Sequence, residues 1–357
     1  MQRNKISFKG QKIFVGIDVH KSKWAVTCMT ESGFKHTYAQ KASAADLSVY
    51  LRRNFPDGEY QAVYEAGFTG FSTYYALMQH DIACIVIHAA DVPSTQYDEV
   101  MKTDKVDSEK LAKSLRAGLL RGIYIREAEN LDDRGVVRLR NAIVKDVSRY
   151  KIRAKHLLMS NGVELPEESQ ANRGRWTGSL IRWMREDVKL LSTTRRSLDM
   201  LLDQVETMRK SLLSATRQVR SLSRLERYRE NFDLLMSVPG VGHIIAMTML
   251  TEICDVGRFS NERQFAHYLG LIPTSHSSGD KTIHGEKTFR GNKNLGPMIV
   301  EASWTAIRRD AGLGAVYSRY CLRMKPQKAI IRIARKMSNI IYSVLKTRKA
   351  YDPYTFG

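Results

Sequence analysis

The first 120 residues alternate short apolar runs with helical segments in an order that strongly restricts the fold. Apolar or alternating runs predict five strands, at residues 13–18, 24–30, 34–39, 61–65 and 82–87. Helical spacing of apolar residues predicts three helices, at residues 44–54, 70–80 and 104–120. Three strands joined by hairpins, followed by two strands reached through helices, predict an α/β domain with a mixed sheet covered by helices.

Four acidic residues lie at the ends of these predicted elements: Asp18, Glu65, Asp104 and Asp107. The element order is typical of the RNase H-like nuclease fold, in which the first strand lies centrally beside the fourth. We therefore expect Asp18 and Glu65 to lie close together, and the spacing of Asp104 and Asp107 places both on one helix face. Clustered carboxylates repel one another unless cations intervene, and oxygen ligands favour Mg²⁺ or Mn²⁺. The alternative is that each acid simply ends a strand or caps a helix.

The charge of the chain favours a polyanionic partner. Its 57 Lys and Arg residues exceed its 37 Asp and Glu residues, which gives a formal net charge of +20. Such a field attracts nucleic acid and releases the counterions of its phosphates. A pair of metal ions about 4 Å apart at the acids can then activate a nucleophile and stabilise the leaving oxygen in phosphoryl transfer.

Cysteine usage and hydropathy argue against several classes of protein. The four cysteines form no Cys-x-x-Cys pair and have no histidine at zinc spacing, which argues against a structural zinc site and a disulfide framework. The N-terminal stretch lacks the apolar region of a secretory signal, and no run is apolar over enough residues to span a bilayer. We therefore expect a cytoplasmic protein without membrane contact.

Residues 126–230 are basic and almost free of strand signals. Apolar residues repeat at a and d positions over about four heptads, from Leu191 to Leu222, which predicts a coiled coil. A similar run of apolar residues, from Val136 to Leu157, precedes a polar break. The two runs can pair within one chain as a helical hairpin or join two chains. The basic outer face of this helical linker is either solvated or in contact with a duplex.

Residues 231–357 predict a mainly helical domain that begins with a helix-hairpin-helix-like motif. A helix ends before Pro239-Gly240-Val241-Gly242, and an apolar helix follows over residues 243–251. Gly240 and Gly242 permit a tight turn whose exposed N–H groups can bind a phosphate. An ordinary joint between two helices, without a ligand, is the alternative.

A serine-rich polar segment over residues 273–281 predicts a loop. The basic stretch that ends this loop and follows it supplies four candidate phosphate-binding residues, Lys281, Lys287, Arg290 and Lys293. A serine in an electropositive loop can attack a phosphodiester as a covalent nucleophile when a base or a metal takes its proton. From the local sequence alone, an ordinary turn is the simpler interpretation.

Five segments taken in order, GIDVHK, YEAG, KTDKVD, SVPGVG and YLGLIP…SSG…RGNKNL, resemble the DEDD transposases of bacterial insertion sequences that recombine DNA under a bridge RNA. The resemblance extends over nearly the whole chain. It implies a RuvC-like domain with the RNase H fold at 1–125, a coiled-coil linker at 126–230 and a C-terminal transposase domain at 231–357. It also implies that the four acids of the family correspond to Asp18, Glu65, Asp104 and Asp107.

The resemblance further implies a serine nucleophile and a mechanism. The serine of the family precedes a glycine in the loop after the Leu-Pro-type motif, which corresponds to Ser278, while Ser277 and Ser275 stay open as alternatives. Mg²⁺ at the acids would help this serine attack a phosphate of donor or target DNA and form a serine–DNA intermediate. The implied partners are a structured guide RNA and further copies of the chain, from dimer to tetramer. The acids and the serine of one site can then come from different subunits.

Three functions therefore have to be compared. The first is an RNA-guided, serine-dependent recombinase of the bacterial cytoplasm and nucleoid. The second is a metal-only, RuvC-like, structure-specific DNA endonuclease, and the third is a nucleic-acid-binding protein whose acids are structural. The domain after residue 231 weighs against the second function, and the ordered set of acids weighs against the third.

Overall fold

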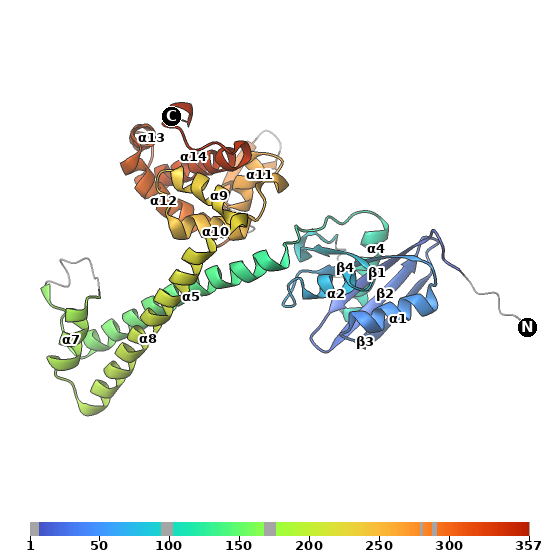
Figure 1. The fold of residues 1–357 in the computed structure, drawn as a ribbon, viewed down its shortest axis with the longest axis horizontal. Helices are drawn as coiled ribbons and strands as arrows, with labels where there is room; N and C mark the ends of the chain where they lie inside the picture. The colour runs from blue at the N-terminus through green and yellow to red at the C-terminus, as the bar shows by residue number, and fades with distance from the viewer. Residues whose placement is uncertain (1–6, 94–102, 168–175, 279–280, 288–290, 357) are drawn as a thin grey trace, which may run out of the picture. The chain divides into compact units, whose positions relative to one another are not determined.

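The computed structural model of the chain describes residues 7–93, 103–167, 176–278, 281–287 and 291–356, with side chains described outside 273–287. The chain divides into two compact units, residues 1–125 and residues 126–357, which are described separately below (Figure 1). None of the helices within the described ranges combines the length and the apolar character needed to cross a membrane.

The first unit is built on a five-stranded mixed sheet. Its strands are β1 (Lys12–Val19), β2 (Lys23–Thr30), β3 (Lys35–Lys41), β4 (Glu59–Glu65) and β5 (Ala83–Ile87). Their order across the sheet is β3-β2-β1-β4-β5, with β1 antiparallel to β2 and parallel to β4. The prediction of a mixed, RNase H-like sheet with the first strand central and the fourth beside it is confirmed.

Helices cover both faces of this sheet. Helices α1 (Ala44–Asn54) and α2 (Ser72–Met78) pack on one face, where Ile13, Val15 and Ile17 of β1 are buried. Helix α4 (Asp104–Arg116) packs on the other face, against Phe14 and its neighbours. A short 3₁₀ helix, η1 (Ala89–Asp91), follows β5.

Helix α4 ends earlier than the expected residue 120. Gly118 adopts a φ of +67°, the left-handed conformation that favours glycine after a helix end. The amide of Leu119 then donates to the carbonyl of Ser114 at 3.0 Å. Leu119, which lies beyond the helix end, is 62% exposed.

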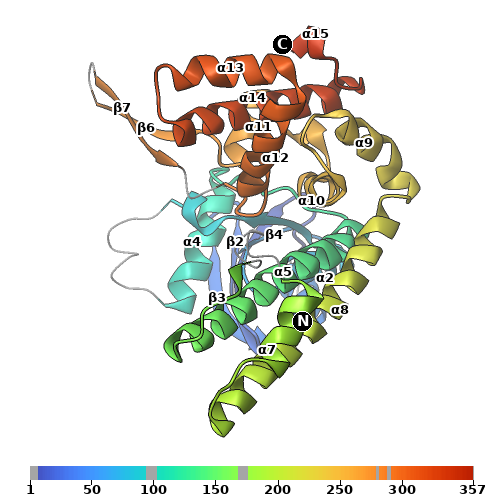
Figure 2. The same cartoon turned by 90° about the vertical axis from the view of Figure 1, so that its left-hand side faces the viewer.

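Two long helices open the second unit and pair with each other. Helix α5 (Ala128–Ser160) and helix α8 (Ser192–Leu222) are joined through α7 (Gly178–Glu186), and both views show the long helices side by side (Figures 1 and 2). Ala154 and Leu158 of α5 are buried with Leu198 and Leu202 of α8. Of the two arrangements left open by the sequence, the structure contains the helical hairpin within one chain.

The remaining helices of this unit surround a second core. They are α9 (Glu226–Ser237), α10 (His243–Ile253), η2 (Val256–Arg258), α11 (Glu262–Tyr268), α12 (Leu295–Arg309), α13 (Ala311–Cys321), α14 (Pro326–Thr347) and α15 (Pro353–Phe356). Val137 of α5 and Val219 of α8 belong to this same core. The base of the helical hairpin and the C-terminal helices are thus one packed body.

Most of the segment expected to be a loop over residues 273–281 belongs instead to the strands of an antiparallel β-hairpin. Strand β6 (Pro273–Ser278) pairs with β7 (Lys281–Lys287), and Ser278 is opposite Lys281. The loop prediction was wrong because two hairpin signals were overlooked. The strands carry β-branched residues such as Thr282 and Ile283, and they are separated in the sequence by a Gly-Asp pair, which is typical of two-residue hairpin connections.

Candidate active site

The ends of β1 and β4 bring two of the four acids into neighbouring positions. In the parallel pairing of these strands Ile17 is opposite Tyr64, so Asp18 and Glu65 are the next residues along each strand. Ile17 and Tyr64 are buried on the face covered by α1 and α2. Because side chains alternate between the faces of a sheet, Asp18 and Glu65 belong to the opposite face, on which α4 packs.

The backbone of helix α4 packs directly against the backbone of β1, because Gly16 has no side chain to separate them. A Cβ atom on Gly16 would lie 2.5 Å from the amide nitrogen of Ala112 and closer still to the carbonyl oxygen of Ser108. The buried hydroxyl of Ser108 also lies 2.9 Å from the hydroxyl oxygen of Thr27 on β2. These contacts fix the distance and the rotation of α4, so that its first turn faces the end of β1.

The first turn of α4 carries the other two acids. Thr103 caps the helix, with its side-chain oxygen accepting from the amide of Val106 at 3.3 Å, and Asp104 and Asp107 follow in the first turn. Carboxylates at a helix N-terminus are favoured by the helix dipole, so the local sequence alone accounts for two acids in this turn. Their position above Gly16 and Asp18, in contrast, depends on the packing of α4.

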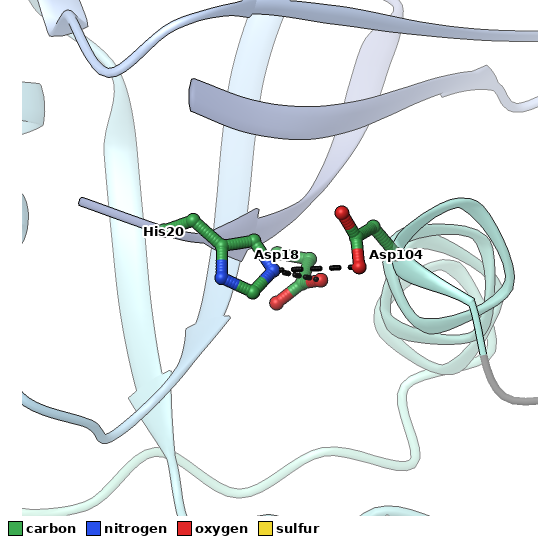
Figure 3. Close-up of side chains that lie close together, drawn as sticks. All are labelled: Asp18, His20 and Asp104. Carbon is green, nitrogen blue, oxygen red and sulfur yellow. Dashed lines mark hydrogen bonds and ion pairs between the residues drawn. The ribbon is translucent and has the colours of Figure 1, made fainter. Parts of the chain in front are cut away.

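Asp18, Asp104 and His20 form a compact cluster (Figure 3). Nε2 of His20 lies 3.1 Å from Oδ2 of Asp18 and 3.5 Å from Oδ1 of Asp104. One ligand atom of each of the three residues lies within 4.8 Å of the others. Residues from the end of β1 and the start of α4 therefore converge on one point, as Figure 3 shows.

The electrostatics of the cluster favour a cation. Burial raises the pKa of the Asp18 carboxyl above its ordinary value, the contact with His20 opposes this, and the charges of Asp104 and Asp107 raise the pKa further. Asp107 therefore lies near enough to Asp18 to interact with it, although it is outside the cluster of three. A positive ion would relieve both the desolvation and the repulsion.

The donor set of the cluster fits a divalent metal. Mg²⁺ binds oxygen ligands at about 2.1 Å, so two of its ligands are at most about 4.2 Å apart. The three donor atoms lie within 4.8 Å of one another, and the side chains of His20 and Asp104 are about half exposed and able to adjust. Two carboxylates and one imidazole also suit Mn²⁺ and related ions.

The cluster contains two of the four predicted acids and one histidine that was not predicted. The structure brings Asp18 and Asp104 together, while strand register places Glu65 beside Asp18 and outside the cluster of three. His20 was missed. Its signal was the spacing of two residues from Asp18, which repeats on one face of an extended chain, but a single histidine near an acid is too common to be decisive.

The candidate nucleophile and the four basic candidates belong to the second unit. Ser278 is the last residue of β6, and Lys281 and Lys287 are the first and last residues of β7. The structure describes the backbones of these three residues. Arg290 lies outside the described residues. Lys293 is described and exposed, and it lies two residues before the start of α12.

The helix-hairpin-helix-like motif is present, and its two glycines have different surroundings. Gly240 has a φ of +82° in the turn between α9 and α10, and a Cβ atom there would lie 2.9 Å from the amide of Ala306 and closer still to the carbonyl of Ala302. Gly240 is thus required for the turn and for packing on α12. Gly242 is exposed, has open space around it and begins α10 without a side-chain cap. Of the two, Gly242 is the one whose surroundings leave room for a phosphate.

Two protein-family models match the chain. The model of the DEDD transposase domain of IS110 elements, described as "Transposase", matches residues 15–161. The model described as "Transposase IS116/IS110/IS902 family" matches residues 232–318. The first match contains the four acids, and the second contains the helix-hairpin-helix-like motif and the hairpin with Ser278.

Several curated proteins are similar over most of their length. A putative transposase of Sinorhizobium fredii, y4qE, is 28% identical over 300 residues, which are 83% of this chain and 72% of that protein. A second putative transposase of the same organism, y4rJ, is 26% identical over 91% of this chain and 89% of its own length. The transposase for insertion sequence element IS1533 of Leptospira borgpetersenii is 25% identical over 72% of this chain and 74% of its own length.

Proposed function

The chain belongs to the IS110 family of insertion-sequence transposases, which cut and rejoin DNA, and from this premise we propose that it does so through a covalent serine–DNA intermediate. In this proposal a divalent metal, Mg²⁺ or Mn²⁺, is held by the acids of the first unit. Ser278 of the second unit is the nucleophile, and a structured guide RNA selects donor and target DNA.

One observation carries the metal part of the proposal: Asp18 at the end of β1 meets Asp104 at the start of α4. The residues that would hold the metal are Asp18, Asp104, Asp107 and Glu65, with the imidazole of His20 beside them. When bound, a divalent metal lowers the charge of a phosphate and helps to deprotonate a nucleophile. The chain itself supplies the fixed frame, because Gly16 and Ser108 hold α4 on the sheet.

The serine step exchanges one phosphodiester for another. The bond between Oγ of Ser278 and phosphorus forms as one bond between phosphorus and a deoxyribose oxygen breaks. The hydroxyl proton of the serine passes to a base, and the departing deoxyribose oxygen takes up a proton. Attack by the hydroxyl of another strand reverses the step, releases the serine and rejoins DNA without hydrolysis. The cycle therefore needs no external energy source.

The binding part of the proposal rests on charge. The net charge of +20 favours nucleic acid, and Lys293, with Lys281, Lys287 and Arg290 nearby in the sequence, supplies positive charge close to the hairpin of Ser278. The exposed backbone at Gly242 adds a second candidate phosphate contact at the start of α10. Dimers or tetramers would allow the acids of one copy to act with the serine of another.

Trapping of a covalent adduct tests the nucleophile. Wild-type protein, labelled DNA carrying the ends of the element, the RNA that copurifies and Mg²⁺ are expected to give a protein–DNA adduct that survives a denaturing gel. Ser278→Ala is expected to abolish the adduct, whereas Ser275→Ala and Ser277→Ala are expected to keep it. An adduct that persists in Ser278→Ala and disappears in one of the other two variants would assign the nucleophile to that serine.

A second arm separates the recombinase from a metal-only endonuclease. If Ser278→Ala still cuts DNA and leaves ends without attached protein, water is the nucleophile and the endonuclease is the correct function. Asp18→Ala is expected to lose cutting and adduct formation but to keep DNA and RNA binding in a gel-shift assay. Sequencing of the copurified RNA checks the guide, because unrelated cellular RNA fragments would contradict a dedicated partner.

A further inference from the structure

A fully buried carboxylate lies at the centre of the second unit. Glu252 of α10 is 1% exposed, and its two carboxylate oxygens accept from Nε and Nη2 of Arg138 on α5 at 2.6 and 2.9 Å. Nη1 of Arg134, one helical turn earlier, lies 3.9 Å away. A buried carboxylate is tolerated only when it is paired and hydrogen-bonded, and the bidentate arginine satisfies this condition. Glu252 is thereby tied to the first turns of α5.

The same carboxylate also holds the segment that follows β7. Nδ2 of Asn292 donates to Oε2 of Glu252 at 3.0 Å, and Nδ2 of Asn294 lies 3.4 Å from Oε1. The hydroxyl of Tyr268 at the end of α11 donates to the carbonyl of Glu252 at 2.7 Å. Nδ2 of Asn292 also donates to that hydroxyl at 3.0 Å, and the amide of Asn292 donates to the carbonyl of Tyr268 at 2.7 Å.

The two chain segments tied in this way are the two ends of the β6–β7 hairpin. Tyr268 precedes β6, and Asn292 follows β7. Next to them the backbones of the two segments cross in direct contact at Gly270 and Gly291. A Cβ atom on Gly291 would lie 2.6 Å from the amide nitrogen of Gly270 and closer still to its Cα. Figure 2 shows the hairpin projecting beyond the helices of its unit. This crossing attaches the hairpin to the unit.

We propose that Glu252, Asn292 and Tyr268 are positioning residues that fix the base of the hairpin and so determine where Ser278 is presented to DNA. The proposal rests on the proposed role of Ser278. Because the hairpin is attached at its base, a small rotation at the crossing displaces its far end by a larger distance. A misplacement of about 1 Å in a reacting group can reduce a rate by about 10²-fold. The partly buried hydrogen bonds at the base keep that rotation small.

The structure offers a variant that loosens the base and a chemically identical control. Tyr268→Phe removes the hydroxyl that joins Asn292 to Glu252 and leaves the ring in place. Tyr351→Phe is the control, because the hydroxyl of Tyr351 also donates to a protein acceptor of the same unit, Oδ2 of Asp310, at 2.9 Å. Both substitutions remove one hydroxyl, and only the first lies at the base of the hairpin.

A second variant removes the hydrogen bond that Asn292 donates to Glu252. Asn292→Ser removes the amide that reaches Glu252. In the wild type, Oδ1 of Asn292 accepts from the amides of Asn294 and Leu295 at the start of α12. The hydroxyl oxygen of serine can take over this acceptor role. This variant preserves the helix start and the pair between Glu252 and Arg138, so it is expected to fold.

The experiment compares these full-length variants with wild type in the presence of DNA, copurified RNA and Mg²⁺. The readouts are the thermal midpoint, the Kd for DNA, and the single-turnover rate of adduct formation at saturating DNA. We expect Tyr268→Phe and Asn292→Ser to slow adduct formation at least about tenfold while the Kd changes less than about twofold. Tyr351→Phe is expected to lower the thermal midpoint by a similar amount and to keep the wild-type rate.

The outcomes separate this inference from the proposed function. A Ser278→Ala protein that still forms the adduct overturns both, because Ser278 is then not the nucleophile. An adduct that requires Ser278 but forms at the wild-type rate in Tyr268→Phe and Asn292→Ser overturns the positioning role alone. Equal slowing in Tyr351→Phe also overturns it, because the rate then follows general stability. Slowing confined to the two variants at the base supports it.

Discussion

Substitution of Gly16 by alanine tests whether the distance between α4 and the sheet controls the candidate active site. Gly16 lies on β1 two residues before Asp18, directly under α4. A Cβ atom there would lie 2.5 Å from the amide nitrogen of Ala112 and 3.0 Å from Cβ of Leu111, with the carbonyl of Ser108 nearest of all. The two nearest atoms belong to the helix backbone, so no side-chain rotation relieves the overlap. Helix α4 has to move away from β1.

The size of this movement follows from the contact distances. Carbon atoms contact their neighbours at roughly 3.5 Å, so the overlap with the amide of Ala112 requires a displacement of about 1 Å. Overpacking of this kind costs about 1–3 kcal/mol of folding free energy. Catalytic groups have to be held within about 0.5 Å, and a 1 Å error can cost about 10²-fold in rate. Since Asp104 and Asp107 move with α4, the loss of activity should be much larger than the loss of folded protein.

The assay measures folding and function in parallel. Gly16→Ala is expected to lower the urea midpoint by the equivalent of about 1–3 kcal/mol and to weaken Mg²⁺ binding in a calorimetric titration. It should reduce DNA cutting about 10²-fold at a temperature where the protein is folded. The control is Gly122→Ala, where a Cβ atom would meet Ile85 at an ordinary 3.5 Å. Gly16→Ala with wild-type Mg²⁺ affinity and cutting rate would refute the reasoning.

Further perturbations test other parts of the chain. Leu198→Ala, at a fully buried position of the helical hairpin, should lower the free energy of unfolding in urea by about 2–5 kcal/mol. Leu191→Ala, at an 84% exposed position, should change it by less than about 0.5 kcal/mol. Equal losses in the two variants would contradict the observed pairing of α5 with α8. Burial raises the pKa of Asp18, so its ionised form opposes folding above its ordinary pKa. Asp18→Asn should therefore melt no lower than wild type in metal-free buffer and should lose the rise in thermal midpoint that Mg²⁺ gives. Burial alone would raise the pKa of Glu252, but the hydrogen bonds and charges around it lower the pKa on balance. Ionised Glu252 therefore stabilises the folded state above the ordinary glutamate pKa of about 4.3. This contribution to the free energy of unfolding is lost as the pH falls through the lowered pKa of the folded state. The difference in unfolding free energy between wild type and Glu252→Gln should shrink on acidification, and a constant difference would exclude an ionised carboxylate.

The sheet of the first unit was predictable because its signals are local. Short apolar runs such as 13–18 and 82–87 give strands wherever they are buried, and hairpins or helical crossovers then restrict their pairing. The order of elements was sufficient to place β1 beside β4, and hence Asp18 beside Glu65. The contact between Asp18 and Asp104 required more than local signals, because it depends on how closely α4 approaches the sheet.

Contacts between distant segments account for what the sequence did not predict. The pairing of α5 with α8 within one chain is decided by the connection through α7, whereas a heptad pattern is equally compatible with two chains. Glu252 in the segment TEIC has no local feature that distinguishes it from a surface glutamate. Its role depends on Arg138 and Asn292, which lie far away in the sequence. The sequence predicts a loop where the β6–β7 hairpin lies, because polar residues in a basic stretch are typical of a loop.

Glycines placed next to candidate functional residues give the two units a common principle of construction. Gly16 lies two residues before Asp18, Gly240 lies two residues before Gly242, and Gly291 directly precedes Asn292. At each glycine another segment approaches so closely that a Cβ atom would overlap with backbone atoms. A position fixed by backbone contact cannot be adjusted by a change of rotamer, so the neighbouring functional group inherits the rigidity of the main chain. Because the contact is between backbones, these glycines do not tolerate substitution. Any side chain at Gly16, Gly240 or Gly291 has to displace the segment that packs on it, and the displacement reaches the adjacent functional residue.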